Sequence, residues 1–299
     1  MEKQKISLRN LLCIAGAALL FAGLCVSIAF NVYQSFESYD SYLQSVDQIY
    51  VMEAGILRNN LEFRDGEDFD FRYDFAHGDY AELKTEYELE NTARDGTEFD
   101  RALRLMHEYA PRLTHESYYD NHVPANALAL LEYSLDNPKQ GINCRAKAQI
   151  LNEMYLALGI YARKVWIMPY SGYDTDCHVV NEIWDRARGK WIMLDVTNDE
   201  YWVDEEGAPL SVLEIREKAA LREFCTPVAS GDRTDDLQTL KNKRIGDFLY
   251  IVKNMVYMEY CTEYTAGESK DTRLLLPQNM SARSGSAISK SSAERSPIE

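Results

Sequence analysis

QGINCRAKA at residues 140–148 decides the fold of this chain, together with two strand-like runs, HVVNEIW at 178–184 and KWIMLDVT at 190–197. Apolar residues recur at helical spacing from Ala148 to Leu158 and stop at Gly159, which predicts a helix over residues 144–158. The two later runs flank a turn around residues 185–189. The three stretches therefore predict a helix followed by an antiparallel hairpin.

These stretches carry Cys144, His178 and Asp195, the three groups that an activated cysteine nucleophile needs. Cys144 falls in the first turn of the expected helix, where the helix dipole and free backbone N–H groups favour thiolate over thiol. The same N–H groups are candidates for an oxyanion hole, with Asn143 and Gln140 as side-chain helpers. We therefore predict Cys144 as nucleophile, His178 as general base and acid, and Asp195 as the carboxylate that orients the imidazole.

This prediction depends on the register of the hairpin. Opposed residues in an antiparallel pair have position numbers with a constant sum, and they share a face. If position 183 or 185 opposes position 190, the sum is odd, and His178 and Asp195 face the same side. If position 184 does so, they point to opposite faces. We predict the odd register, with a bulge at Gly189 as one way to reach it.

At these residues the chain resembles the transglutaminase-like superfamily of papain-type cysteine enzymes. The matching pieces lie in order along the chain: an amphipathic helix at 98–109, Gly141–Arg145, Leu158–Val165, His178 with Glu182, and Gly189–Thr197. The resemblance implies an α+β fold with a papain-like transglutaminase core, in which the nucleophile helix packs on an antiparallel sheet. It also implies thioester chemistry on amide or peptide bonds, with a protein or peptide substrate and an amine or water as acceptor.

Two other interpretations stay open at this stage. Folds of this kind also serve as inactive modules, so a non-catalytic surface binding or assembly module is the alternative function. A metal site formed by Cys144, Cys177, His178 and Asp195 is disfavoured, because adjacent strand residues point to opposite faces and no Cys-x-x-Cys pair occurs. We expect neither metal nor cofactor.

The loop before His178, residues 170–176, is rich in aromatic and acidic side chains and leads directly into the histidine. We therefore expect it to line the substrate cleft. Trp191 shares the strand face of Asp195 and is a further candidate for shielding the His–Asp pair. The cleft candidates are Tyr170, Tyr173, Asp174, Asp176 and Trp191.

The N-terminus indicates where this chemistry takes place. Three basic residues precede an uncharged run of twenty residues, Leu11–Phe30, which is long enough to span a bilayer as a helix. The basic flank should remain in the cytoplasm, which places the remainder outside a cell, as in a membrane-anchored bacterial member of the family. The alternative is secretion after cleavage of a signal peptide. A mature chain that begins at Phe30 would identify the cleaved form.

Charge and composition divide the remaining sequence. The chain has a net charge of −16, and residues 35–100 hold 18 acidic against 5 basic side chains, which argues against nucleic acid as a partner.

An apolar stripe from Val32 to Tyr50 predicts either a homodimer stalk or a helix packed on its own domain. Cys225 and Cys261 are a candidate disulfide pair. The expected divisions are a cytoplasmic tip and transmembrane anchor at 1–31, a membrane-proximal helical and acidic segment at 32–95, the transglutaminase-like domain at 96–262, and a disordered tail at 263–299.

Overall fold

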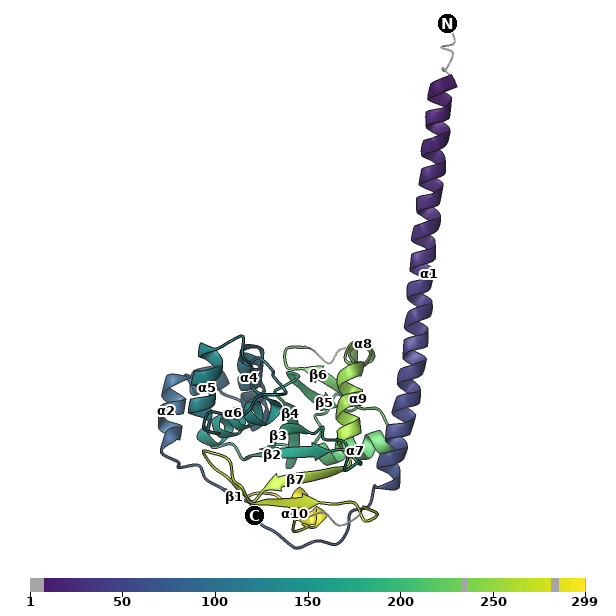
Figure 1. Ribbon diagram of the computed structural model, residues 1–299. Coiled ribbons are helices and arrows are strands. Elements are labelled where there is room, and N and C mark those ends of the chain that lie inside the picture. Colours follow the sequence, from purple (N-terminus) through teal and green to yellow (C-terminus); the bar gives the residue numbers. More distant parts are fainter. Residues whose placement is uncertain (1–7, 233–235, 281–284, 299) are drawn as a thin grey trace. The chain divides into compact units, whose positions relative to one another are not determined.

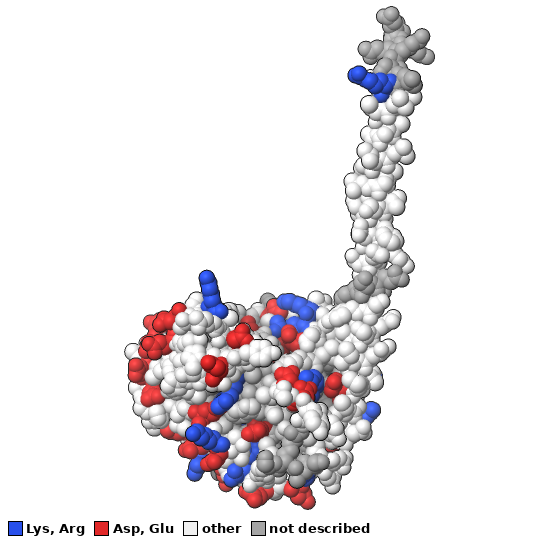
Figure 2. All heavy atoms as spheres, in the orientation of Figure 1, with Lys and Arg blue, Asp and Glu red and all other residues white. Residues whose placement is uncertain are grey.

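The computed structural model describes residues 8–232, 236–280 and 285–298, and the chain divides into two compact units, Met1–Ile49 and Tyr50–Glu299. The first unit is helical: α1, Leu8–Asn59, begins in it and ends in the second. Within α1, Arg9–Ser35 is long and apolar enough to cross a membrane, with a hydropathy of 2.5. A signal sequence would have the same length and composition. Figure 2 shows this segment almost free of charged side chains.

The second unit combines short helices with strands (Figure 1). Its helices are α2, Asp79–Glu86; α3, Leu89–Ala93; α4, Glu98–Tyr109; η1, Ala110–Arg112; α5, Ala127–Asp136; α6, Cys144–Ala157; α7, Val212–Leu221; α8, Leu237–Lys243; α9, Ile245–Asn254; and α10, Lys290–Glu294. Its strands are β1, Arg72–Tyr73; β2, Ala162–Met168; β3, His178–Asp185; β4, Lys190–Asp195; β5, Glu200–Val203; β6, Thr226–Ala229; β7, Tyr257–Cys261; β8, Glu263–Tyr264; and β9, Thr272–Leu275.

Within the described residues, seven strands form one sheet in the order β6-β5-β4-β3-β2-β7-β9. Every neighbouring pair in it is antiparallel. A separate parallel pair joins β1 to β8. All eight residues of β3 are buried, because β3 is central in the sheet and both of its faces are covered. The structure is therefore α+β with an antiparallel sheet, as the sequence predicts.

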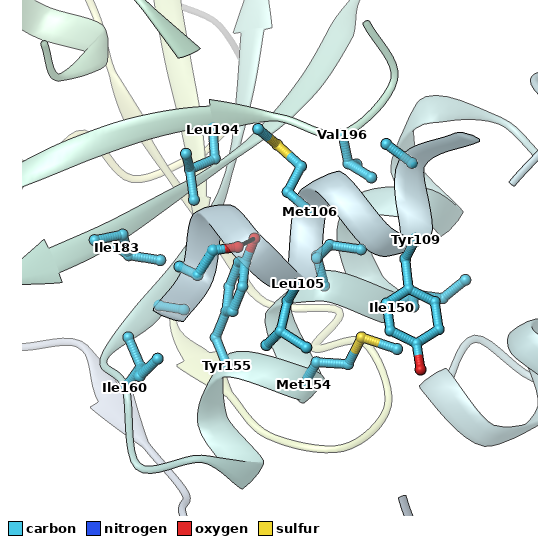
Figure 3. Close-up of a cluster of buried hydrophobic side chains, with 14 of the residues drawn as sticks. Leu105, Met106, Tyr109, Ile150, Met154, Tyr155, Ile160, Ile183, Leu194 and Val196 are labelled. Carbon is cyan, nitrogen blue, oxygen red and sulfur yellow. Dashed lines mark hydrogen bonds between the residues drawn. The ribbon is translucent and has the colours of Figure 1, made fainter. Parts of the chain in front are cut away.

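The two faces of the sheet bury different clusters. On one face, Ile183 of β3 and Leu194 of β4 pack with α4 and α6. Figure 3 shows this cluster, in which Leu105 and Met106 of α4 lie among side chains of α6. On the other face, side chains of β3 and β4 such as Val180 and Met193 pack with α7 and α9. Alternation along each strand thus decides which layer a side chain enters.

The helix that carries Cys144 is buried along nearly its whole length. Every residue of α6 from Ala146 to Ala157 is buried, so α6 is a central helix with no solvated stripe. The predicted helices over 98–109 and 144–158 are confirmed. A capping box at Thr97 and Asp100 fixes the start of α4.

The predicted odd register of the hairpin is confirmed. β3 pairs with β4 through Asp185↔Lys190 and Asn181↔Leu194, so opposed positions sum to 375. The pairing continues without a bulge up to a turn in which Gly189 takes a φ of +64°. Its amide donates to the Asp185 carbonyl at 2.8 Å. The odd register is therefore reached without the bulge considered at Gly189. Instead, this glycine takes the left-handed conformation that closes the turn.

The expected disordered tail at 263–299 is wrong for the described residues. Strand β9 extends the sheet beside β7, and Leu275 and Ile288 are buried in the core. The Arg163 guanidinium donates to the Ala293 carbonyl at 2.7 Å. The composition of this segment, rich in Ser and Ala, is typical of disorder. It does not reveal that the segment pairs with the edge of β7 and accepts hydrogen bonds from buried donors.

The expected division of the chain also changes. The expected boundary at residue 95 falls inside a compact unit that begins at Tyr50. The dimer stalk stays a prediction, because side chains on which it rests (Phe36, Tyr39 and Leu43) lie outside the described ones.

Candidate active site

Cys144 is the first residue of α6, and the residue before it fixes this position. Asn143 has extended backbone angles (φ −78°, ψ 172°), and its side-chain oxygen accepts from the Ala146 amide at 3.0 Å. This is the N-cap arrangement that satisfies one of the free N–H groups of a helix start. The Cys144 side chain is partly exposed. The local sequence therefore presents a thiol at the positive end of a helix.

His178 and Asp195 form a buried pair across the hairpin. The imidazole Nε2 lies 2.7 Å from Asp195 Oδ2, and both side chains are almost fully buried. In the observed register Asp195 opposes position 180, so the two residues are diagonal neighbours on one face. The turn after β4 holds the carboxylate: Oδ1 accepts from the Thr197 amide at 2.9 Å, and Oδ2 accepts from the Asn198 side chain at 3.0 Å.

Burial disfavours the charged forms of His178 and Asp195, but the attraction between the two groups outweighs this effect. Attraction to the Asp195 carboxylate, with a further contribution from Cys144, raises the pKa of His178 to about 10 despite burial. Attraction to His178 and the backbone amides of Thr197 and Asn198 lower the pKa of Asp195, again against burial. The pair is therefore an imidazolium and a carboxylate near neutral pH.

Cys144 and His178 open into one cavity of about 610 Å³. Asp174 and Asp176 also line it, as expected for this loop. Asn143 lines it too, and its expected help to the oxyanion hole stays a prediction. Both aspartates bind one ammonium: Lys253 Nζ lies 2.9 Å from Asp174 Oδ2 and 3.2 Å from Asp176 Oδ2. The acidic loop therefore reaches the cleft with its charge partly neutralised.

Other predicted site residues do not line this cavity. Gln140 accepts a hydrogen bond from the Tyr133 hydroxyl at 3.0 Å. Tyr170 is half exposed and Tyr173 is 99% exposed. These side chains lie on the surface because the loop turns its carboxylates, rather than its tyrosines, towards the cavity.

The structure places Trp191 away from the cleft, which corrects the expectation for this residue. It shares the strand face of Asp195 but lies four residues earlier, roughly 13 Å along a strand. Its ring packs under the Arg163 guanidinium at 3.9 Å, and its Nε1 donates to the Arg295 carbonyl at 3.1 Å. Trp191 is therefore a core residue at the opposite end of the hairpin.

Three residues near the site have no signal in the local sequence. His115 and Tyr250 line the cavity, and they come from segments far from the triad in the chain. Lys147 follows Cys144 by one helical turn and is almost fully buried. Burial lowers the pKa of Lys147 to about 8, against the attraction of Asp195 and Cys144. Only its place one turn after Cys144 could have suggested Lys147.

The remaining cysteines are free thiols. Cys177 lines the same cavity as Cys144, and burial, with Cys144 and Asp176 nearby, raises its pKa to about 11. Cys225 and Cys261 are buried and unpaired. Over the described part of the chain, no group of three or more His, Cys, Asp and Glu side chains is arranged to hold a metal ion.

Residues 85–196 match the family model described as the transglutaminase-like superfamily. The chain thus contains a transglutaminase-like domain, and the match includes Cys144, His178 and Asp195. A crystal structure from Cytophaga hutchinsonii, described as a candidate cysteine protease, aligns with 16% identity over 54% of this chain and 59% of that one. Its TM-score of 0.30 is too low to carry an argument. No curated protein matches the chain.

Proposed function

We propose that this protein is a transglutaminase-like cysteine enzyme that acts on amide or peptide bonds of a protein or peptide. The observation that carries the proposal is the His178–Asp195 pair at 2.7 Å beside a thiol at a helix N-terminus, all within one cavity. The membership of residues 85–196 in the superfamily supports it. The site is located at the cell surface if α1 anchors the chain with its C-terminal domain outside.

The reaction follows from these groups. The Cys144 thiolate attacks the carbonyl carbon of the amide, and the N–H groups of the first turn of α6 stabilise the resulting oxyanion. His178 gives its proton to the departing nitrogen as the C–N bond breaks, leaving a thioester on Cys144. Neutral His178 then takes a proton from water or from an amine, which attacks the thioester and frees Cys144. Asp195 keeps the imidazole oriented throughout.

A labelling experiment tests the proposal without a known substrate. With the full chain in detergent micelles, iodoacetamide should label Cys144 faster at pH 7 than Cys177, Cys225 or Cys261, as followed by peptide mass spectrometry. His178→Ala should slow the labelling of Cys144 about tenfold or more, since the thiolate loses its imidazolium partner. Equal rates at all four cysteines, unaffected by His178→Ala, would instead favour a non-catalytic binding module.

Turnover is then assayed with a fluorescent amine and with peptide libraries, using Cys144→Ala as the inactive control. Incorporation of the amine indicates transfer, whereas cleavage of peptides indicates proteolysis. Release of ammonia without incorporation indicates deamidation. A signal that persists in Cys144→Ala would contradict a cysteine mechanism.

A further inference from the structure

Helix α9 contacts the catalytic histidine from outside the triad. The Tyr250 ring meets the His178 imidazole edge to face, with ring centroids 5.3 Å apart and an interplanar angle of 71°. Such a pair is attractive beyond its buried area and has a preferred geometry. The ring of Tyr250 therefore restricts the orientation of an imidazole whose Nε2 is already held by Asp195.

The hydroxyl of Tyr250 holds the segment that leads into His178. It donates to Asp176 Oδ1 at 3.2 Å and lies 3.5 Å from the Cys177 carbonyl. Burial and the nearby Asp176 carboxylate raise the pKa of Tyr250, so its phenol remains a donor through the neutral range. One turn further along α9, Lys253 binds Asp174 and Asp176. Helix α9 thus fixes both the imidazole and the backbone that enters β3.

Aromatic contacts in the core hold helix α9 in place. Phe248 of α9 is buried and stacks on Trp202 at 5.3 Å, with an interplanar angle of 21°. Its ring also meets Tyr50 edge to face at 4.9 Å. Because both neighbours belong to the same compact unit, Tyr250 projects from an element whose own position is determined by the core.

We propose that Tyr250 is a positioning residue, which aligns His178 for proton exchange with Cys144 by ring contact and by hydrogen bonding to the loop before β3. This role rests on the proposed function, since it concerns the histidine of that mechanism. Asp195 holds the imidazole at Nε2, and Tyr250 contacts it through its own ring. Asp195 sets its charge and one hydrogen bond, and Tyr250 limits its rotation and its access to water.

The test uses two variants of the full chain in detergent micelles. Tyr250→Leu removes the ring contact and should slow labelling of Cys144 by iodoacetamide about tenfold at pH 7. It should also move the midpoint of the rate-against-pH profile upward, because a mobile imidazolium stabilises the thiolate less. Tyr250→Phe keeps the ring, and its rate should fall between those of Tyr250→Leu and the wild type. If Tyr250→Leu does not fold, Tyr250→Phe alone carries the test.

The hydrogen bond has its own test. Asp176→Ala removes the closer acceptor of the Tyr250 hydroxyl, so Tyr250→Phe should slow labelling less in the Asp176→Ala background than in the wild type. Tyr161→Phe and Tyr161→Leu are the matched controls, because Tyr161 packs on Tyr73 and Phe75 rather than on the cavity. Both controls should keep the wild-type profile.

Three outcomes would overturn the proposal. The first is a folded Tyr250→Leu protein, or a Tyr250→Phe protein where only that variant folds, with the wild-type labelling profile. The second is wild-type labelling combined with lower turnover, which would make Tyr250 a substrate contact. The third is labelling of the wild type that does not respond to His178→Ala. This last result would refute the triad itself. The failure of the positioning role and the failure of the proposed function can thus be told apart.

Discussion

At the scale of single residues, the candidate active site contains a pair of charged side chains that the protein buries away from water. His178 and Asp195 are 2% and 0% exposed, and leaving either one unpaired at that depth would be costly. The carboxylate is held by the imidazole, by two backbone amides and by the Asn198 side chain. Its position is thus fixed before any substrate binds, which is what an orienting carboxylate requires.

The pair predicts how stability depends on pH. The pKa of His178 is raised from 6.5 to about 10, so its contribution is complete below pH 6.5 and disappears as the pH rises towards 10. The pKa of Asp195 is lowered from 3.8, so its contribution is present above that value and disappears on acidification. Asp195→Asn should therefore cost about 3 kcal/mol near pH 6 and much less at pH 10. Denaturant titrations at both values measure this, and an equal cost at both would contradict it.

At the scale of elements, α6 both presents Cys144 to the cavity and forms the centre of the core. Its first residue is partly exposed at the cavity, while the following turns are buried between α4, α5 and the sheet. The Asn143 cap sets the residue at which the helix begins. If the helix began one residue later, Cys144 would leave the first turn and lose its place at the free backbone N–H groups there.

Removing this cap should affect both stability and chemistry. Asn143→Ala should lower the free energy of unfolding by about 1 kcal/mol and slow labelling of Cys144, because the first turn loses its anchor. Ser211→Ala is the matched control: Ser211 caps α7 by accepting from the Glu214 amide at 3.2 Å, away from the cavity. It should cost a similar free energy and leave labelling unchanged. Equal effects of the two variants on labelling would exclude a local role for Asn143.

At the scale of the whole molecule, the C-terminal segment packs against the central strands of the sheet and accepts hydrogen bonds from them. Arg163 is buried with Glu182 at 2.7 Å and also donates to the Ala293 carbonyl. Trp191 donates to the Arg295 carbonyl from the same region. The last described residues therefore supply carbonyl acceptors to Arg163 and Trp191 on the central strands.

Truncation after Ile288 should therefore destabilise the protein by about 3 kcal/mol or more, because it uncovers a buried ion pair and removes two carbonyl acceptors. Thermal or denaturant unfolding of the shortened chain measures the loss. Arg295→Ala removes only the surface ion pairs with Asp68 and Asp70, and it should have a small effect. A truncated chain as stable as the full one would restore the expectation of a disordered tail.

Much of the site could be predicted because its parts are local in sequence. The start of α6 follows from Asn143 and the helical spacing behind Cys144. The hairpin brings His178 near Asp195 because they are only 17 residues apart around one turn. Even the register could be predicted by parity, since alternation along a strand is fixed by backbone geometry. The apolar N-terminal helix is equally a property of composition.

The remaining features depend on neighbours that are distant in the chain. Tyr250 and His115 reach the cavity only because α9 and the segment before α5 pack around β3 and α6. Trp191 was misplaced because parity gives the face of a strand but not the end at which a cleft opens. Strand β9 was missed because edge pairing depends on the exposed edge of β7.

The sequence by itself thus pointed to Cys144, His178 and Asp195, and it determined the helix and hairpin that carry them and the apolar segment at the N-terminus. These features follow from short-range backbone geometry and from the spacing of apolar residues. Only the tertiary structure decided which other side chains surround His178, and that the C-terminal segment belongs to the sheet. Burial and hydrogen bonding between distant segments are set by which surfaces meet when the chain folds, and no local pattern specifies them.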